Sequence, residues 1–111
     1  MPAGNPDHLP SGGSTFWARY EIGNRETLEK GEFISVHGGY NTGYAAENPM
    51  VLLPLDALKQ HVRDGHIGSL HPYYYVLTGN QTAKGDAVRM AREIVAKVRE
   101  DAVQAIILGS T

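Results

Sequence analysis

The feature that most constrains the fold is an amphipathic helix followed at once by an almost wholly apolar run. The helix is expected over residues 86–101, because its apolar residues recur with the helical period of 3.6: Ala87, Ala91, Ile94 and Val98. The run "VQAIIL", residues 103–108, is typical of a strand covered on both faces. With the strand candidate "YYYVL", residues 73–77, the order predicts a right-handed βαβ unit. The expected fold is therefore α/β, with a small, mainly parallel sheet of the Rossmann-like or flavodoxin-like kind.

The rest of the chain predicts one domain with an irregular lead-in. Residues 1–13 are rich in Pro, Gly and polar residues and have no apolar period, so the domain is expected over 14–111. "FISVH", residues 33–37, is a short β-branched and aromatic run that predicts a strand, and residues 38–49 predict a glycine-rich loop. Pro54 is expected to open a helix that Gly65 ends.

Composition and charge exclude several classes of protein. The formal net charge is −2 and the basic residues form no run, so the positive face of a nucleic-acid binder is missing. The absence of cysteine excludes disulfides and thiolate metal sites, and is typical of a cytoplasmic protein. No apolar run approaches the roughly 20 residues of a membrane span. We expect no membrane segment and a cytoplasmic location.

The histidines do not predict a metal site. His61, His66 and His71 are evenly spaced, but a spacing of five does not place two side chains on one face of a helix. No HExxH-type pattern is present either. We therefore expect no metal ligands, with His61 as a solvated helix residue.

Two loops are candidates for ligand binding, each with a plainer alternative. "GNQTAKG", residues 79–85, precedes a helix N-terminus, where backbone N–H groups favour an anion; the plainer interpretation is an ordinary strand-to-helix loop that needs Gly for its turns. "HGGYNTGY", residues 37–44, combines polar and aromatic side chains with three glycines, as a binding loop or as a tight turn with surface tyrosines. Ser110 lacks the G-x-S-x-G elbow of a serine hydrolase.

Four stretches, in order and over nearly the whole chain, resemble the selenoprotein subunit of component B in the glycine, sarcosine and betaine reductases, with D-proline reductase as a more distant relative. They are "GNPDHLPSGGSTFWARYEI", "HGGYNTGYAAENP", "LPLDALKQHVRDGHIGSLHPYYYVLTGNQTAKGDAVRMAREI" and "DAVQAIILGST". Two departures concern substrate identity: Gly109 stands where the family usually has Thr, and "GNQT" replaces the more common "GNGT".

The resemblance implies that the chain is a fragment of a larger subunit. In the family, the Ser-Thr pair matched by Ser110 and Thr111 leads directly into selenocysteine-Gly-Thr-Cys. The catalytic selenocysteine is therefore expected directly after Thr111, with its UGA codon read as a stop, and the chain alone is expected to be inactive. Family members also carry a long region before the segment matching "GNPDH", so Met1 is expected to mark an internal start.

The resemblance also implies a reaction and its partners. The complete subunit would cleave a C–N bond reductively, through a carboxymethyl-selenocysteine intermediate, and acetyl phosphate would be the final product. A pyruvoyl group on a partner subunit of component B, the component A selenoprotein, component C and a thioredoxin system would take part. Because the two candidate loops leave the carboxyl ends of predicted strands, we expect five substrate-facing residues: His37, Tyr40, Asn41, Asn80 and Thr82.

Two alternatives from other classes stay open. A short relative that kept the fold would be a non-catalytic binding or assembly module within the reductase complex. A small stand-alone α/β domain would instead bind an anionic metabolite at residues 79–85.

Overall fold

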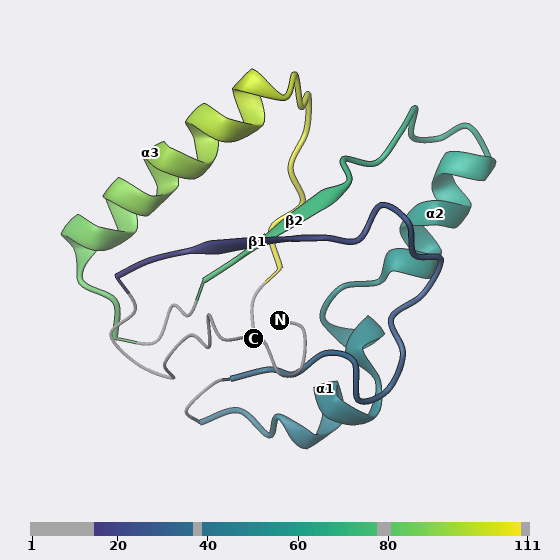
Figure 1. The fold of residues 1–111 in the computed structure, drawn as a ribbon, viewed down its shortest axis with the longest axis horizontal. Helices are drawn as coiled ribbons and strands as arrows, with labels where there is room; N and C mark the ends of the chain where they lie inside the picture. The colour runs from purple at the N-terminus through teal and green to yellow at the C-terminus, as the bar shows by residue number, and fades with distance from the viewer. Residues whose placement is uncertain (1–14, 37–38, 78–80, 110–111) are drawn as a thin grey trace.

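The computed structural model describes residues 15–36, 39–77 and 81–109, and Figure 1 shows their arrangement. Two strands cross the centre of the view, with α3 toward the upper left, α2 toward the right and α1 below. The elements in chain order are β1 (Ala18–Glu21), α1 (Gly43–Glu47), the 3₁₀ helix η1 (Pro49–Val51), α2 (Leu55–Arg63), β2 (Tyr73–Val76) and α3 (Lys84–Glu100).

The two strands form an antiparallel ribbon whose register is set by aromatic pairs. Tyr20 lies opposite Tyr74, and their ring centroids are 5.6 Å apart. On the other face, the guanidinium of Arg19 lies 4.6 Å from the centroid of the Tyr73 ring. Such pairs stabilise a ribbon beyond the area they bury, which helps so short a sheet to form.

The main core lies between α2 and the segment that follows β1. Its buried members are Ile22, Leu28, Phe33 and Leu55, with Tyr74 packed against them from β2. Leu55 is only 2% exposed because Pro54 starts α2 with this side chain pointing inward. Burial raises the pKa of the Tyr74 hydroxyl, with Tyr20 nearby adding to the effect, so Tyr74 stays neutral at physiological pH.

The long helix α3 is fastened to the start of the described chain by polar contacts. The indole N–H of Trp17 donates to Glu93 at 2.8 Å, and Arg89 donates to the same carboxylate at 2.9 Å. These two donors hold the pKa of Glu93 below its ordinary value. Arg89 also donates to the backbone carbonyl of Thr15, so one side chain joins α3 to the segment before β1.

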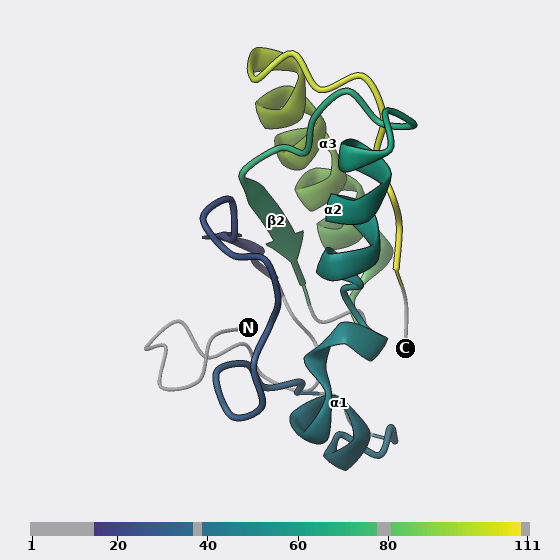
Figure 2. The same ribbon diagram turned by 90° about the vertical axis from the view of Figure 1, so that its right-hand side faces the viewer.

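The two expected helices, α2 and α3, and the expected strand β2 are confirmed, but the prediction of a parallel sheet is wrong. β1 and β2 run antiparallel, so the described residues contain no parallel βαβ unit. Residues 103–108 form no strand, and Figure 2 shows the segment running back from the end of α3 at the opposite side of the view from β2. The described part of "FISVH", residues 33–36, is also outside any strand, and the loop expected over 38–49 contains α1. The α/β class itself stands, with one small ribbon and three α-helices among the described residues.

A strand needs a neighbour with free backbone groups, which explains the error at residues 103–108. The apolar pattern correctly indicates a segment suited to burial on both sides. In this structure no strand pairs with it, and Ile107 and Leu108 are 71% and 91% exposed. The apolar pattern therefore predicts that residues 103–108 are suited to a place between neighbouring strands. The described part of this chain contains no strand that pairs with them.

Candidate functional site

Residues at the end of β2 and at the end of the described chain line the same apolar cavity. Leu77, directly after β2, and Leu108 both line it, together with residues of α3 that include Met90 and Ile94. Its volume is about 240 Å³. The end of β2 and residue 108 thus lie beside one cavity, although the sheet is not the one expected.

A third segment reaches the same end of the chain. A Cβ built on Gly109 would lie 3.6 Å from the backbone carbonyl oxygen of Leu52, the residue after η1. Leu52 closes the stretch that begins with Tyr40 and Asn41 and runs through α1 and η1. Leu77 thus shares a cavity with Leu108, and Leu52 lies beside Gly109, so we take this corner as the candidate functional site.

Two of the predicted site residues stand immediately ahead of α1. Tyr40 is half-buried and Asn41 is exposed. The side-chain oxygen of Asn41 accepts a hydrogen bond from the Gly43 N–H at 3.1 Å, and its backbone oxygen accepts one from Tyr44 at 3.4 Å. Asn41 therefore shapes the turn that begins α1, in the way Asn side chains commonly do in Asx turns. Its amide NH₂ takes no part in these two hydrogen bonds.

Thr82 lies in the turn that leads into α3. It is half-buried, and it follows Gln81, whose φ of 57° is a left-handed conformation that side chains rarely adopt. Ala83 is the N-cap residue of α3 and supplies no side-chain cap. Asp86 in the first turn is engaged by Arg89 at 3.2 Å. The structure thus brings Thr82 to the start of α3 and Tyr40 with Asn41 to the start of α1.

The other predicted residues lie outside the described ranges. These are His37, Asn80, Ser110 and Thr111. Their proposed roles remain predictions from the sequence.

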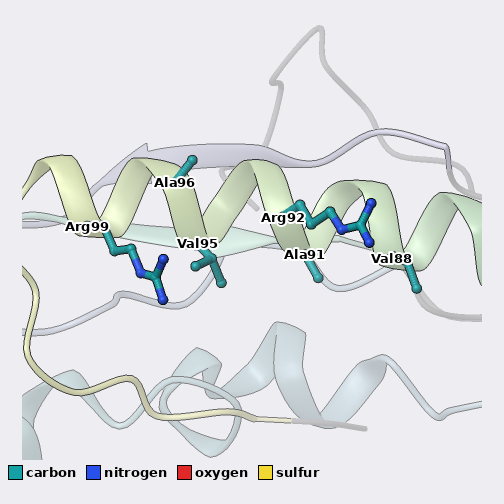
Figure 3. A pocket seen from close by; sticks show the side chains of 6 residues that line it. All are labelled: Val88, Ala91, Arg92, Val95, Ala96 and Arg99. Atoms are coloured by element: carbon teal, nitrogen blue, oxygen red, sulfur yellow. The ribbon is translucent and has the colours of Figure 1, made fainter.

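One side of α3 carries an apolar surface that is partly exposed. Figure 3 shows a shallow groove of about 400 Å³ along it, lined in part by Val95 and Ala91, which lie between the side chains of Arg99 and Arg92, and by Val88 beyond Arg92. Val88 and Val95 are 41% and 39% exposed. We call this face of α3, together with Ile106, Ile107 and Leu108, the outer apolar surface.

A polar cluster that no sequence motif predicts lies at the other end of α3. Asp101 accepts from His71 at 3.2 Å, and it also lies 3.9 Å from Arg19 and 3.5 Å from Lys97. Glu100 and Asp101 raise the pKa of Lys97. These residues come from three distant segments, so no local motif could have indicated the cluster. It ties β1, the start of β2 and the end of α3 together.

Within the described residues no group of three or more His, Cys, Asp or Glu side chains is arranged to hold a metal ion. None of the described helices is long and apolar enough to cross a membrane.

Comparisons with known proteins agree on one family. The model of the family described as glycine/sarcosine/betaine reductase selenoprotein B matches residues 1–111. The chain is similar, at 38% identity over its whole length, to the betaine reductase complex component B subunit beta of Peptoclostridium acidaminophilum, of which it covers 25%. It is 36% identical to the glycine reductase complex component B subunit gamma of Carboxydothermus hydrogenoformans, of which it covers 26%. It is 34% identical to the sarcosine reductase complex component B subunit beta of Peptoclostridium acidaminophilum, again over 26% of that protein.

The chain thus spans about a quarter of the length of the curated relatives it matches. No solved structure matches it.

Proposed function

The chain belongs to the glycine/sarcosine/betaine reductase selenoprotein B family, and we propose that it is the part of a component B subunit that holds substrate-facing loops of the reductase. The complete subunit would take part in reductive cleavage of a C–N bond. The observation that supports the proposal is that Leu77, at the end of β2, and Leu108 line one cavity, with Leu52 beside Gly109.

The roles of this chain's residues follow from their chemistry. The Thr82 hydroxyl and the backbone at the start of α3 would orient the carboxylate of an amino-acid substrate, since a helix N-terminus favours an anion. Tyr40 and the amide NH₂ of Asn41 would contact the same substrate from the α1 side. The apolar side chains of Met90 and Ile94 would keep water from the reacting atoms.

The reacting group lies outside this chain in the proposal. A selenocysteine directly after Thr111 would supply a nucleophile already ionised at neutral pH, as thiolates do when their pKa is low. By family resemblance the pyruvoyl group belongs to a partner subunit, and the component A selenoprotein, component C and a thioredoxin system would complete the reaction. No residue of this chain is assigned to hold the pyruvoyl group.

Removing the hydroxyl of Thr82 or Tyr40 tests the proposal. In the complete component B subunit, Thr82→Val and Tyr40→Phe should each lower kcat/KM about tenfold or more, because each removes a polar substrate contact at nearly constant volume. The measurement is amine release in the reconstituted reductase with glycine, sarcosine and betaine in turn. Thr27→Val, in an exposed turn away from the site, is the matched control and should leave kcat/KM unchanged. Equal effects at Thr27 and Thr82, or none at Thr82 and Tyr40, would exclude the substrate role.

A second candidate function, assembly, is favoured by the outer apolar surface. Three consecutive apolar side chains, Ile106, Ile107 and Leu108, are 54%, 71% and 91% exposed, next to the uncovered face of α3. A contiguous apolar surface of this kind usually marks an interface. We assign its cover to the remaining polypeptide of the subunit, because the relatives are about four times as long as the chain. The chain would then act as an integral layer of that subunit.

A further inference from the structure

Two histidines at the carboxyl end of α2 turn their rings toward each other. The Nδ1 atoms of His61 and His66 are 3.1 Å apart, and the ring centroids are 5.3 Å apart. Both side chains are exposed, so an ion from solvent can reach the nitrogens. The pair lies in a different part of the chain from the residues of the candidate site.

The end of the helix creates this pair. α2 ends at Arg63, and Gly65 takes a φ of +75°, which favours glycine and reverses the chain. The backbone N–H groups of His66 and Ile67 then donate to the carbonyl of His61 at 2.9 and 3.2 Å. A spacing of five residues would separate the two rings on a continuous helix. Here the helix has ended, so His66 folds back over His61.

The distance fits two imidazoles that share one metal ion. For metal–nitrogen bonds of about 2.0–2.1 Å, nitrogens at the observed separation subtend an angle of about 100° at the metal. That angle lies between those of square or octahedral and tetrahedral coordination. We propose that His61 and His66 form a binding site for a divalent transition-metal ion with affinity for imidazole, such as Ni²⁺, Cu²⁺ or Zn²⁺.

The surroundings admit a cation. The carboxyl end of a helix carries partial negative charge, which favours a cation there. Arg63, at the end of α2, is paired with Glu26 at 3.1 Å and donates to Gln60. Asp64, the C-cap residue of α2, accepts from Gln60 at 2.8 Å. Because no third His, Cys, Asp or Glu joins the pair among the described residues, water fills the remaining positions and the ion exchanges freely.

Calorimetric titration of the 111-residue chain with NiCl₂ tests the site. The wild-type chain should bind Ni²⁺ saturably, and His61→Asn and His66→Asn should each weaken that binding about tenfold or more, because one ligand of a chelating pair is lost. His71→Asn is the matched control, since the ring nitrogens of His71 already face Tyr73 and Asp101. Its Ni²⁺ affinity should equal that of the wild type.

A second readout needs no variant. Paramagnetic Ni²⁺ should broaden the ring-proton signals of His61 and His66 at lower concentration than those of His71. Melting temperatures without metal check that each variant folds. Absence of saturable binding, unchanged affinity in His61→Asn or His66→Asn, or equal broadening of all three rings would overturn the proposal and leave the pair as a hydrogen bond between imidazoles.

Discussion

Replacing Leu55 by alanine should lower the free energy of unfolding by about 3–4 kcal/mol, a large effect for a single change. Leu55 is 2% exposed and lies in the cluster with Ile22, Leu28 and Phe33, which joins α2 to the segment after β1. Alanine would leave a cavity there, because the surrounding side chains come from elements already fixed by other contacts. A small domain has only about 5–15 kcal/mol to lose.

Urea denaturation followed by circular dichroism measures this effect, and Leu108→Ala is its matched control. The same atoms are removed at a side chain that is 91% exposed, so the free energy of unfolding should change by less than about 0.5 kcal/mol. Leu55→Met, which nearly conserves volume, should cost less than about 1.5 kcal/mol. Equal losses at Leu55 and Leu108 would contradict the location of the core.

Replacing Leu108 by glutamate should change stability little in the 111-residue chain and strongly in the complete subunit. In the 111-residue chain the substitution should change the free energy of unfolding by less than about 0.5 kcal/mol, because the side chain is in water. In the complete subunit it should destabilise by several kcal/mol or prevent folding, because the outer apolar surface is then covered and burying an unpaired carboxylate is costly.

Gln104→Glu controls for charge in the same experiment. It adds a carboxylate to the same exposed segment without removing apolar surface, and both settings should tolerate it. Unfolding of the chain and of the complete subunit, each compared with its own wild type, gives the two differences. If the complete subunit tolerates Leu108→Glu as well as the short chain does, the remaining polypeptide does not cover the outer apolar surface, and that proposal is wrong.

The sequence predicted the elements whose signals are local. The period of Ala87, Ala91, Ile94 and Val98 identified α3, and Pro54 and Gly65 marked the ends of α2 within one or two residues. Tyr73–Val76 was recognised as a strand from its composition. These signals are contained in a few neighbouring residues, so they do not depend on the rest of the fold.

The errors concern partners that a local pattern does not specify. No clear local pattern predicts β1, Ala18–Glu21, as a strand, because its pairing with Tyr73–Val76 depends on aromatic contacts across the ribbon. Residues 103–108 were predicted as a parallel strand from apolar content alone, and no neighbouring strand pairs with them. The sequence spacing does not predict the contact between His61 and His66, because that contact depends on the chain reversal at Gly65.

The candidate site was predictable only in outline. Leu77 and Leu108 line one cavity, which places the end of β2 beside the end of the described chain, although no parallel strand joins them. The local role of Asn41, which holds the Gly43 N–H, was not foreseen. His37, Asn80, Ser110 and Thr111 lie outside the described residues, so their roles stay predictions.

Reading the gene beyond the codon for Thr111 tests the central claim most directly. We propose a catalytic selenocysteine at the next position, so we expect an in-frame UGA followed by codons for Gly, Thr and Cys. A UAA or UAG codon there, or a continuing frame that encodes unrelated residues, would contradict the proposal that this chain is the substrate-facing part of a catalytic component B subunit.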